Sequence, residues 1–312
     1  MLFIAFVFLI KITPVFFLKF NKRLLRFLFG KLSKRFPGIV KRNLELAYPE
    51  KTVAELEQLR KNIYRHFSSI LVDIICLFVK KNPEKLMPPI TITHAEYLEQ
   101  ALQKGRGVIL FSAHFGNWEL IPYILSRKLG LPVSSIARRM DNPLVEKKVL
   151  AFREFMGSQI IDKKVAARAM LKRFAENGIV YLLIDQNTID REAVFVEYFG
   201  KLVSAVPSVS RLLLKKNIPV LPLFLHYEAD RIVLAFQEEL DATAICTPSA
   251  TTEESIVQLT QFCTAIIESQ VRQYPEQWLW FHNRWKATPK KSKRLLSTLS
   301  KIPSPIPGRN IE

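Results

Sequence analysis

The chain has 312 residues, enough for one large domain or two small ones. Its 46 Lys and Arg outnumber its 28 Asp and Glu, which gives a formal net charge of +18, and 49% of its residues are hydrophobic. This composition excludes an intrinsically disordered chain. The three cysteines (Cys76, Cys246 and Cys263) lack metal-ligand spacing. Three cysteines without such spacing exclude a zinc ribbon, an iron–sulfur centre and a disulfide framework. So few thiols favour a reducing compartment.

The positive charge is concentrated at the N-terminus. Residues 1–44 contain ten basic residues and no acidic one, and they include the most apolar segment of the chain. This pairing favours a membrane surface as the partner. A nucleic-acid-binding domain would carry its basic residues throughout, with aromatic residues between them. We therefore expect contact with membrane lipids and no binding of nucleic acid.

The apolar segment Leu2–Phe20 has nineteen residues, which as a helix would be about 28 Å long, close to the thickness of a bilayer core. Lys11 and Pro14 weaken its insertion, so a bent interfacial helix and a buried core helix remain alternatives to a span. No basic region precedes it and no small-residue cleavage site follows, which argues against a signal peptide. The basic residues that follow predict that residues 1–30 anchor the chain in the plasma (inner) membrane, with its body on the cytoplasmic side.

Residues 31–286 are predicted to form one α/β domain. Thr52 and Glu55 form a capping box that opens a long helix ending near Lys80, whose apolar second half packs on the core or touches lipid. Beyond Ile90, apolar strand-like runs alternate with helical runs, which predicts a largely parallel central sheet flanked by helices. The predicted strands are Val108–Ser112, Val133–Ala137, Ile160–Ile161, Ile179–Ile184, Val220–Tyr227 and Arg231–Gln237. The predicted helices are Asn117–Leu129, Leu144–Met156, Val165–Asn177, Ser204–Lys216 and Thr252–Gln273. Residues 287–312, rich in Lys and Pro, are expected to be a basic, disordered tail.

His114 is the first candidate for chemistry. It follows the predicted strand Val108–Ser112, at the carboxyl edge where sheets of this type place their sites. Histidine titrates near neutral pH, so it can accept a proton from a hydroxyl group. Glu119 could orient the ring if the chain turns at Gly116, because on a regular helix the two side chains would diverge by about 140°. Spacing alone leaves a catalytic pair and a structural histidine with a solvated glutamate equally open.

The segment Ser112–Glu119 resembles the H-x4-D/E block of the lysophospholipid acyltransferase superfamily. The resemblance is strongest to the bacterial lipid A lauroyl/myristoyl acyltransferases. Further segments resemble later blocks of that family in the same order: Arg138–Pro143 (with Ala137 where Tyr is usual), Asp185–Asn187, Val196–Gly200 and Trp278–Lys286. The resemblance covers nearly the whole chain apart from the tail.

The resemblance implies that a fatty acyl group moves from a thioester, on acyl carrier protein or coenzyme A, to a hydroxyl of a lipid A precursor. His114 would be the general base and Glu119 would orient it, with no covalent intermediate, no cofactor and no metal. A base fits this chemistry because a neutral alcohol attacks a thioester poorly unless its proton is removed during the attack. Relatives on this scaffold acylate other lipids, so a lysophospholipid or a mannosylated phosphoinositide acceptor stays open. A non-catalytic membrane scaffold on the same fold is a further alternative, but the presence of both His114 and Glu119 argues against it.

Several residues in these blocks are candidates for substrate contact. Arg138 is the candidate donor to the developing oxyanion, because arginine stays charged and carries five N–H groups. A contact with a phosphate or with solvent is the alternative for Arg138. Asn117 either contacts substrate or, as we favour, caps the helix that follows His114. Asp185, after the strand Ile179–Ile184, is a candidate for an acceptor contact or a structural turn.

Arg284 and Lys286 lie close in sequence to Trp280 and Trp285, a combination that suits a lipid headgroup or a phosphate. A packed helix end with solvated charges is the alternative. The basic excess of the chain would also attract an acidic carrier protein and the phosphates of lipid A.

Overall fold

The computed structural model describes residues 37–80, 87–137, 142–162, 165–188 and 193–286. The predicted N-terminal anchor, the predicted C-terminal tail and Arg138 lie outside these residues.

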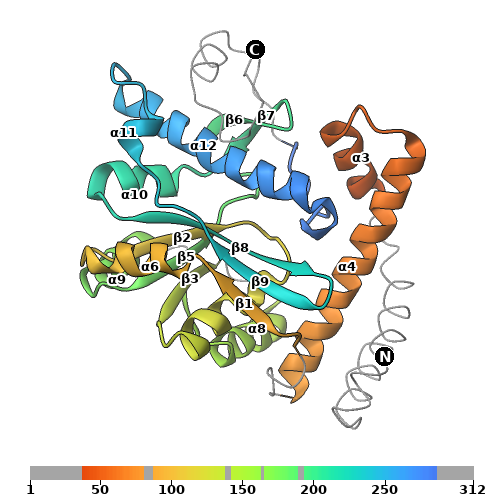
Figure 1. Ribbon diagram of the computed structural model, residues 1–312, viewed down its shortest axis with the longest axis horizontal. Coiled ribbons are helices and arrows are strands. Elements are labelled where there is room, and N and C mark those ends of the chain that lie inside the picture. Colours follow the sequence, from red (N-terminus) through yellow and green to blue (C-terminus); the bar gives the residue numbers. More distant parts are fainter. Residues whose placement is uncertain (1–36, 81–86, 138–141, 163–164, 189–192, 287–312) are drawn as a thin grey trace.

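A seven-stranded sheet forms the centre of the molecule, with strand order β1-β9-β8-β2-β5-β3-β4 (Figure 1). The strands are β1 Ile90–Thr93, β2 Val108–Ser112, β3 Val133–Ala137, β4 Ser158–Asp162, β5 Ile179–Leu183, β8 Val220–Glu228 and β9 Arg231–Phe236. Neighbouring strands from β8 to β4 are parallel, while β8 and β9 are antiparallel. All five residues of the central strand β2 are buried, as expected for a parallel strand that is covered on both faces. The predicted, largely parallel sheet is therefore confirmed.

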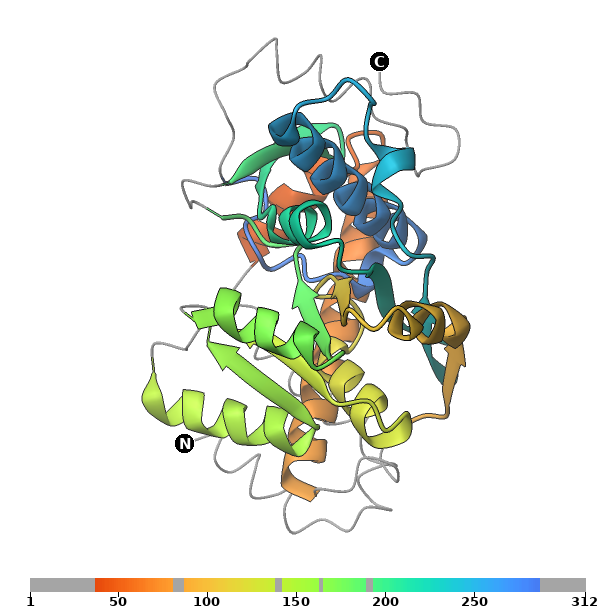
Figure 2. The same cartoon turned by 90° about the vertical axis from the view of Figure 1, so that its left-hand side faces the viewer.

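Helices cover both faces of this sheet (Figure 2). They are α3 Pro37–Ala47, α4 Val53–Lys80, α6 Ala95–Gln103, α8 Pro143–Phe155, α9 Ala166–Ala175, α10 Ser208–Lys216, α11 Ala242–Ile245 and α12 Thr252–Gln273. One apolar cluster joins one face of the sheet to α9, α10 and α12, and a second joins the other face to α6 and α8. The sheet is thus the middle layer of a three-layer α/β architecture.

Helix α4 begins at the predicted capping box, in which Thr52 N donates to Glu55 Oε2 at 2.7 Å and Glu55 N donates to Thr52 Oγ1 at 3.3 Å. By length and composition, Val53–Val79 is the one helix of the described residues that could cross a membrane, and 44% of its most apolar window is buried. Phe67 contributes to one apolar cluster, and Cys76 contributes to the other. The second half of α4 therefore packs on the core.

A β-hairpin occupies part of the region predicted to be a loop followed by a helix. Its strands are β6 Val194–Tyr198 and β7 Lys201–Ala205, so the following helix begins at Ser208 rather than at Ser204. Phe199 and Gly200, at φ 52° and 69°, form the left-handed turn between the strands. Glu268 of α12 accepts a hydrogen bond from Phe199 N at 2.7 Å, and this long-range contact fixes the turn.

The predicted helix Asn117–Leu129 is irregular. It consists of the 3-10 turn Trp118–Leu120, one α-helical turn at Ile121–Tyr123 and a π-helical turn at Ile124–Lys128. Pro122 lacks an N–H group, so it cannot donate the hydrogen bond that a regular helix requires at this position.

Candidate active site

Three segments meet around His114 at the carboxyl edge of the sheet: residues 113–117 after β2, residues 184–188 after β5, and the closing segment 277–285. The first and the last pair as short extended chains. Gly116 N donates to Gln277 O at 2.9 Å, and Leu279 N donates to His114 O at 3.0 Å. The backbone on both sides of Phe115, directly after His114, is thus held by residues close to the end of the described chain.

Gly116 allows the turn after His114. Its φ is +54°, and a Cβ atom at this position would lie 2.0 Å from Leu225 O in the neighbouring strand β8. A larger residue would strain the backbone and would also force the loop away from the sheet. The chain therefore does turn at Gly116, as this glycine permits, but the turn does not bring Glu119 to His114.

The His114 ring is held by a buried carboxylate. Asp185 Oδ1 lies 2.7 Å from His114 Nδ1, and Oδ2 accepts hydrogen bonds from His114 N at 3.0 Å and from Trp278 Nε1 at 2.8 Å. The Asp185 side chain is 3% exposed. Burial raises the pKa of Asp185, but the charge of His114 and the donated hydrogen bonds outweigh it, so the pKa lies below its usual value. An ionised Asp185 keeps a proton on Nδ1, which leaves the lone pair of the ring on Nε2.

The expected pairing of Glu119 with His114 is corrected by this geometry. After the turn at Gly116, the 3-10 segment directs the Glu119 side chain to α8, where Arg153 Nη2 lies 2.7 Å from Oε1 and Arg153 Nε lies 3.1 Å from Oε2. Burial lowers the pKa of Arg153, but the Glu119 hydrogen bond and charge outweigh it and leave the pKa above its usual value. Glu119 thus fastens the segment after His114 to α8, while Asp185 orients the imidazole.

Asn117 is fully buried, and its side chain makes no capping hydrogen bond to the turn Trp118–Leu120. Within the described residues neither amide atom has a hydrogen-bond partner. The favoured prediction of a side-chain cap is therefore wrong, because only the backbone carbonyl of Asn117 bonds to the turn, accepting from Leu120 N at 2.9 Å. Its contact with substrate stays a prediction.

Arg284 is 1% exposed, so it does not lie on an open headgroup-binding surface. Its Nη1 donates to Ser204 O, and its guanidinium carbon lies 5.5 Å from the centre of the Tyr198 ring. Burial lowers the pKa of Arg284 to about 10. Lys286, two residues later, is exposed. The two cations therefore have separate environments, and only Lys286 is free to meet a ligand from solution.

The tryptophans of the closing segment form core rather than a membrane interface. Trp278, Trp280 and Trp285 are each at most 4% exposed. They pack on one another and on Tyr198 and Phe199, with ring centres between 4.7 and 6.4 Å apart. The expected combination of aromatic and cationic groups at a headgroup is corrected, because this segment threads through the interior.

Helix α3 also reaches the closing segment. Asn43 is fully buried, and its Nδ2 donates to Trp280 O at 2.8 Å and to His282 O at 2.7 Å. His282 Nε2 accepts from Asn187 N at 3.1 Å, two residues beyond Asp185. Burial lowers the pKa of His282, which favours the neutral ring that this contact needs. No local sequence signal linked Asn43 or Arg153 to the site, because both act across long sequence separations.

Asn43→Leu is expected to lower the free energy of unfolding by about 2 kcal/mol, since each lost buried hydrogen bond is worth about 1 kcal/mol. Denaturant unfolding of the full chain in detergent measures this change. Asn62→Leu is the matched control, because Asn62 lies on α4 with partly exposed partners; it should change the free energy by less than about 0.5 kcal/mol. Equal changes in unfolding free energy for the two substitutions would contradict a stabilising role for the hydrogen bonds between Asn43 and the closing segment.

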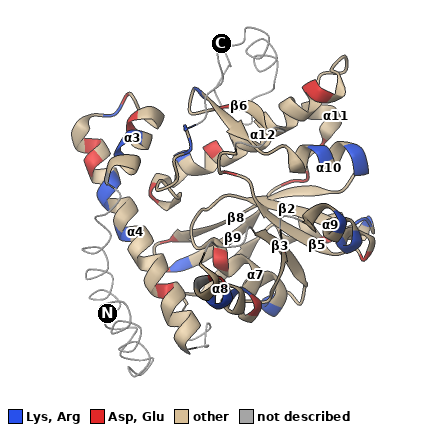
Figure 3. Ribbon diagram, turned by 180° about the vertical axis from the view of Figure 1, so that it is seen from behind, with Lys and Arg blue, Asp and Glu red and all other residues tan. Residues whose placement is uncertain are grey.

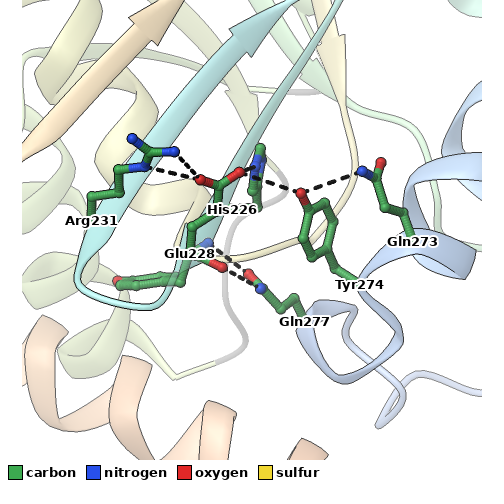
Figure 4. A network of polar contacts seen from close by, with 7 residues as sticks. His226, Glu228, Arg231, Gln273, Tyr274 and Gln277 are labelled. Atoms are coloured by element: carbon green, nitrogen blue, oxygen red, sulfur yellow. Dashed lines mark hydrogen bonds and ion pairs between the residues drawn. The ribbon is translucent and has the colours of Figure 1, made fainter.

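A polar network lies at the end of strand β8, next to the closing segment that holds the His114 loop (Figure 4). The Gln277 side chain pairs with the backbone of Tyr227, accepting from N at 2.9 Å and donating to O at 2.8 Å. The backbone carbonyl of Gln277 accepts the hydrogen bond from Gly116 N. Beside it, His226 lies 3.2 Å from Glu228. Arg231 and Tyr274 complete the contacts of Glu228. Gln277 therefore links the end of strand β8 to the loop that carries His114.

The fold and the site together define an α/β protein that presents a carboxylate-paired histidine at the carboxyl edge of its sheet. The described residues contain no group of three or more His, Cys, Asp or Glu that could hold a metal ion. The chain belongs to the bacterial lipid A biosynthesis acyltransferase family, whose model matches residues 1–287. The resemblance found in the sequence is thereby confirmed, and the protein is an acyltransferase.

Named relatives cover most of the chain at low identity. A lipid A biosynthesis acyltransferase of Haemophilus influenzae is 23% identical over 254 residues, which are 80% of this chain and 76% of the relative. A lipid A biosynthesis lauroyltransferase of Escherichia coli is 25% identical over 272 residues, 83% of each chain. A phosphatidylinositol mannoside acyltransferase of Mycolicibacterium smegmatis is 21% identical over 207 residues, 65% of this chain and 64% of the relative.

Proposed function

We propose that this protein transfers a fatty acyl chain from a thioester to a hydroxyl group of a lipid A precursor. The observation that carries the proposal is the pair of His114 and Asp185, which leaves the lone pair of Nε2 available as a base. Membership of the family and the names of the relatives support the acyl transfer and the lipid acceptor.

In this mechanism His114 Nε2 accepts the hydroxyl proton while the acceptor oxygen attacks the thioester carbonyl. The oxygen–carbon bond forms, the carbon–sulfur bond breaks, and the leaving thiolate takes the proton back from the imidazolium. The negative charge of Asp185 stabilises the imidazolium between these two events. Glu119 acts as a positioning residue in this mechanism, because its carboxylate holds Arg153 and not the ring.

The donor is proposed to be a thioester of acyl carrier protein or of coenzyme A. An acidic carrier protein would be attracted by the net charge of +18. Lys and Arg residues colour parts of the α8, α9 and α10 ribbons blue (Figure 3). The exposed ones include Lys147, Lys148, Arg168, Lys172, Lys215 and Lys216. Arg138 is proposed to stabilise the oxyanion, and Lys286 to contact a phosphate of the acceptor or an anionic lipid.

The protein is proposed to work at the cytoplasmic face of the plasma membrane, where residues 1–30 would anchor it. The ten basic residues among residues 1–44 support this location, since anionic lipids attract basic segments that flank an apolar one. The lipid-modifying relatives also support association with a membrane.

A second acceptor class has its own support. The phosphatidylinositol mannoside acyltransferase of M. smegmatis matches 65% of this chain at 21% identity, which supports a mannosylated phosphoinositide as the alternative acceptor. The same histidine base would serve both acceptors, because each offers a hydroxyl group. A lysophospholipid also offers a hydroxyl group, so the same histidine base would serve it as an acceptor.

The test incubates membranes containing the protein with acyl carrier protein and coenzyme A thioesters of several chain lengths, each with a tetra-acylated lipid A precursor. Parallel reactions contain a mannosylated phosphoinositide or a lysophospholipid. Mass spectrometry is expected to show one added acyl chain on the lipid A precursor. An added chain only on another acceptor would reject the lipid A assignment and keep the acyl transfer.

His114→Ala should lower the rate of this transfer by at least about 10²–10⁴-fold, the usual contribution of a general base. His94→Asn is the control: His94 is exposed, and asparagine tolerates its left-handed backbone at φ 57°. Full transfer by His114→Ala would reject the mechanism, whatever the acceptor.

A further inference from the structure

The side chain of Gln186 lies against the reactive nitrogen of the proposed base. Gln186 Nε2 is 3.3 Å from His114 Nε2, on the opposite side of the ring from Asp185. Because the Nδ1 proton is engaged with Asp185, His114 Nε2 bears a lone pair and the amide N–H of Gln186 donates to it. Among the described residues, no other polar group is hydrogen-bonded to Nε2.

The backbone of Gln186 is held on both sides. Asp185, the preceding residue, accepts three hydrogen bonds through its carboxylate. Asn187 follows it, and its N–H donates to His282 Nε2 at 3.1 Å. The Gln186 side chain itself is only partly buried. A rigid loop therefore aims a movable amide at the position where the base must meet its substrate.

The position of this amide has a chemical consequence. A hydroxyl group that gives its proton to Nε2 must approach within about 2.6–3.2 Å, and the Gln186 amide nitrogen at 3.3 Å stands in its way. An incoming acceptor therefore displaces the amide from Nε2. The attacking oxygen and the thioester oxygen share one carbon atom in the tetrahedral state, so the displaced N–H group stays within reach of the developing oxyanion.

We propose that Gln186 is a further catalytic residue, whose amide N–H caps Nε2 in the resting enzyme and donates to the oxyanion during acyl transfer. The proposal rests on the proposed function of His114 as the base. It adds a neutral donor to that site, and a neutral donor stabilises negative charge without neutralising the nearby Asp185.

The kinetic test compares Gln186→Leu and Gln186→Glu in the full chain, on the acceptor and donor that the wild type uses. Gln186→Leu should lower kcat by about 10²–10³-fold, the usual effect of losing one oxyanion donor, with the acceptor KM changed less than about threefold. Gln186→Glu should lose more at neutral pH, because an ionised carboxylate repels the oxyanion. Its activity relative to the wild type should rise as the pH falls, since a protonated carboxyl regains a donor.

Gln58→Glu is the matched control, because Gln58 is exposed on α4 and the same charge is introduced there. It should leave kcat and the pH profile unchanged. An unchanged kcat in Gln186→Leu, or a rise in acceptor KM alone, would overturn the oxyanion role.

A second measurement needs no acyl transfer. An unprotonated imidazole nitrogen attacks a carbonyl of diethyl pyrocarbonate and becomes carbethoxylated, with ethanol and carbon dioxide released. Removing the amide cap should therefore make carbethoxylation of His114 several-fold faster in Gln186→Leu, as followed by peptide mass spectrometry. An unchanged rate would overturn the resting contact. This result is independent of the proposed function, whose failure would appear as a wild type that transfers no acyl chain to any acceptor.

Discussion

Asp185→Asn is expected to lower kcat for acyl transfer by about 10³–10⁴-fold while the acceptor KM changes little. In the native protein, Asp185 Oδ2 accepts from His114 N and Trp278 Nε1, and Oδ1 accepts from His114 Nδ1. An asparagine has one side-chain oxygen, which would accept from His114 N and Trp278 Nε1. Its NH2 group would then face Nδ1, and the ring proton would move to Nε2, where no lone pair would remain to act as a base.

Single-turnover kinetics with product masses would measure this loss. Asp230→Asn, at an exposed turn after β8, makes the same chemical change away from the site and should retain full activity. If Asp185→Asn kept more than about a tenth of the wild-type kcat, the orienting role of Asp185 would be wrong.

The same substitution should change the pH dependence of stability. The pKa of Asp185 lies below its usual value in the folded protein. Its ionised form therefore stabilises the fold above that usual value, and this contribution is lost as the pH falls through the lower, folded value. The difference in unfolding free energy between wild type and Asp185→Asn should accordingly shrink on acidification below about pH 4. Denaturant unfolding at a series of acidic pH values would measure it.

Gly116→Ala is expected to lower the free energy of unfolding by about 3–5 kcal/mol and to reduce kcat as well. The left-handed backbone, at φ +54°, accounts for about 1–2 kcal/mol with an alanine side chain. The remainder comes from the approach of the new Cβ atom to Leu225 O, which would be 2.0 Å without a shift of the loop. Such a shift would strain the hydrogen bond from Gly116 N to Gln277 O and move His114.

Gly105→Ala separates the two contributions. Gly105 also has a left-handed backbone, at φ +67°, but nothing lies within 4 Å of the position of its Cβ atom. This control should cost only about 1–2 kcal/mol and leave kcat unchanged. Equal losses of stability in the two variants, measured by denaturant unfolding, would show that the contact with Leu225 is not what makes Gly116 necessary.

Local patterns predicted six of the seven strands of the sheet, and β1 Ile90–Thr93 was missed. β2 and β3 begin and end at the predicted residues, because each is a short run rich in apolar residues between polar or glycine-containing turns. The capping box at Thr52 is equally local, since its two partners are three residues apart. The hairpin β6–β7 was missed, because its turn depends on Glu268 in a distant helix.

In the candidate site, too, the sequence identified individual residues, whereas their contacts became clear only in the structure. His114 was identifiable from its block and from its position after a strand, and Gly116 from the turn it permits. Asp185 was singled out as a candidate without its partner. Its contact with His114 spans 71 residues and exists because β5 pairs with β2, which brings the carboxyl ends of both strands together. Sequence spacing favoured Glu119 because it measures distance only along the chain.

The sequence by itself determined the family, the largely parallel sheet and the histidine at its edge, because these follow from local residue patterns and from the order of blocks along the chain. Only the tertiary structure decided which carboxylate holds His114, that Arg284 is buried, and that Gln186 faces Nε2. The physical reason is that burial and long-range hydrogen bonds depend on which strands are neighbours and on how the closing segment packs across them. No periodicity within one segment carries that information.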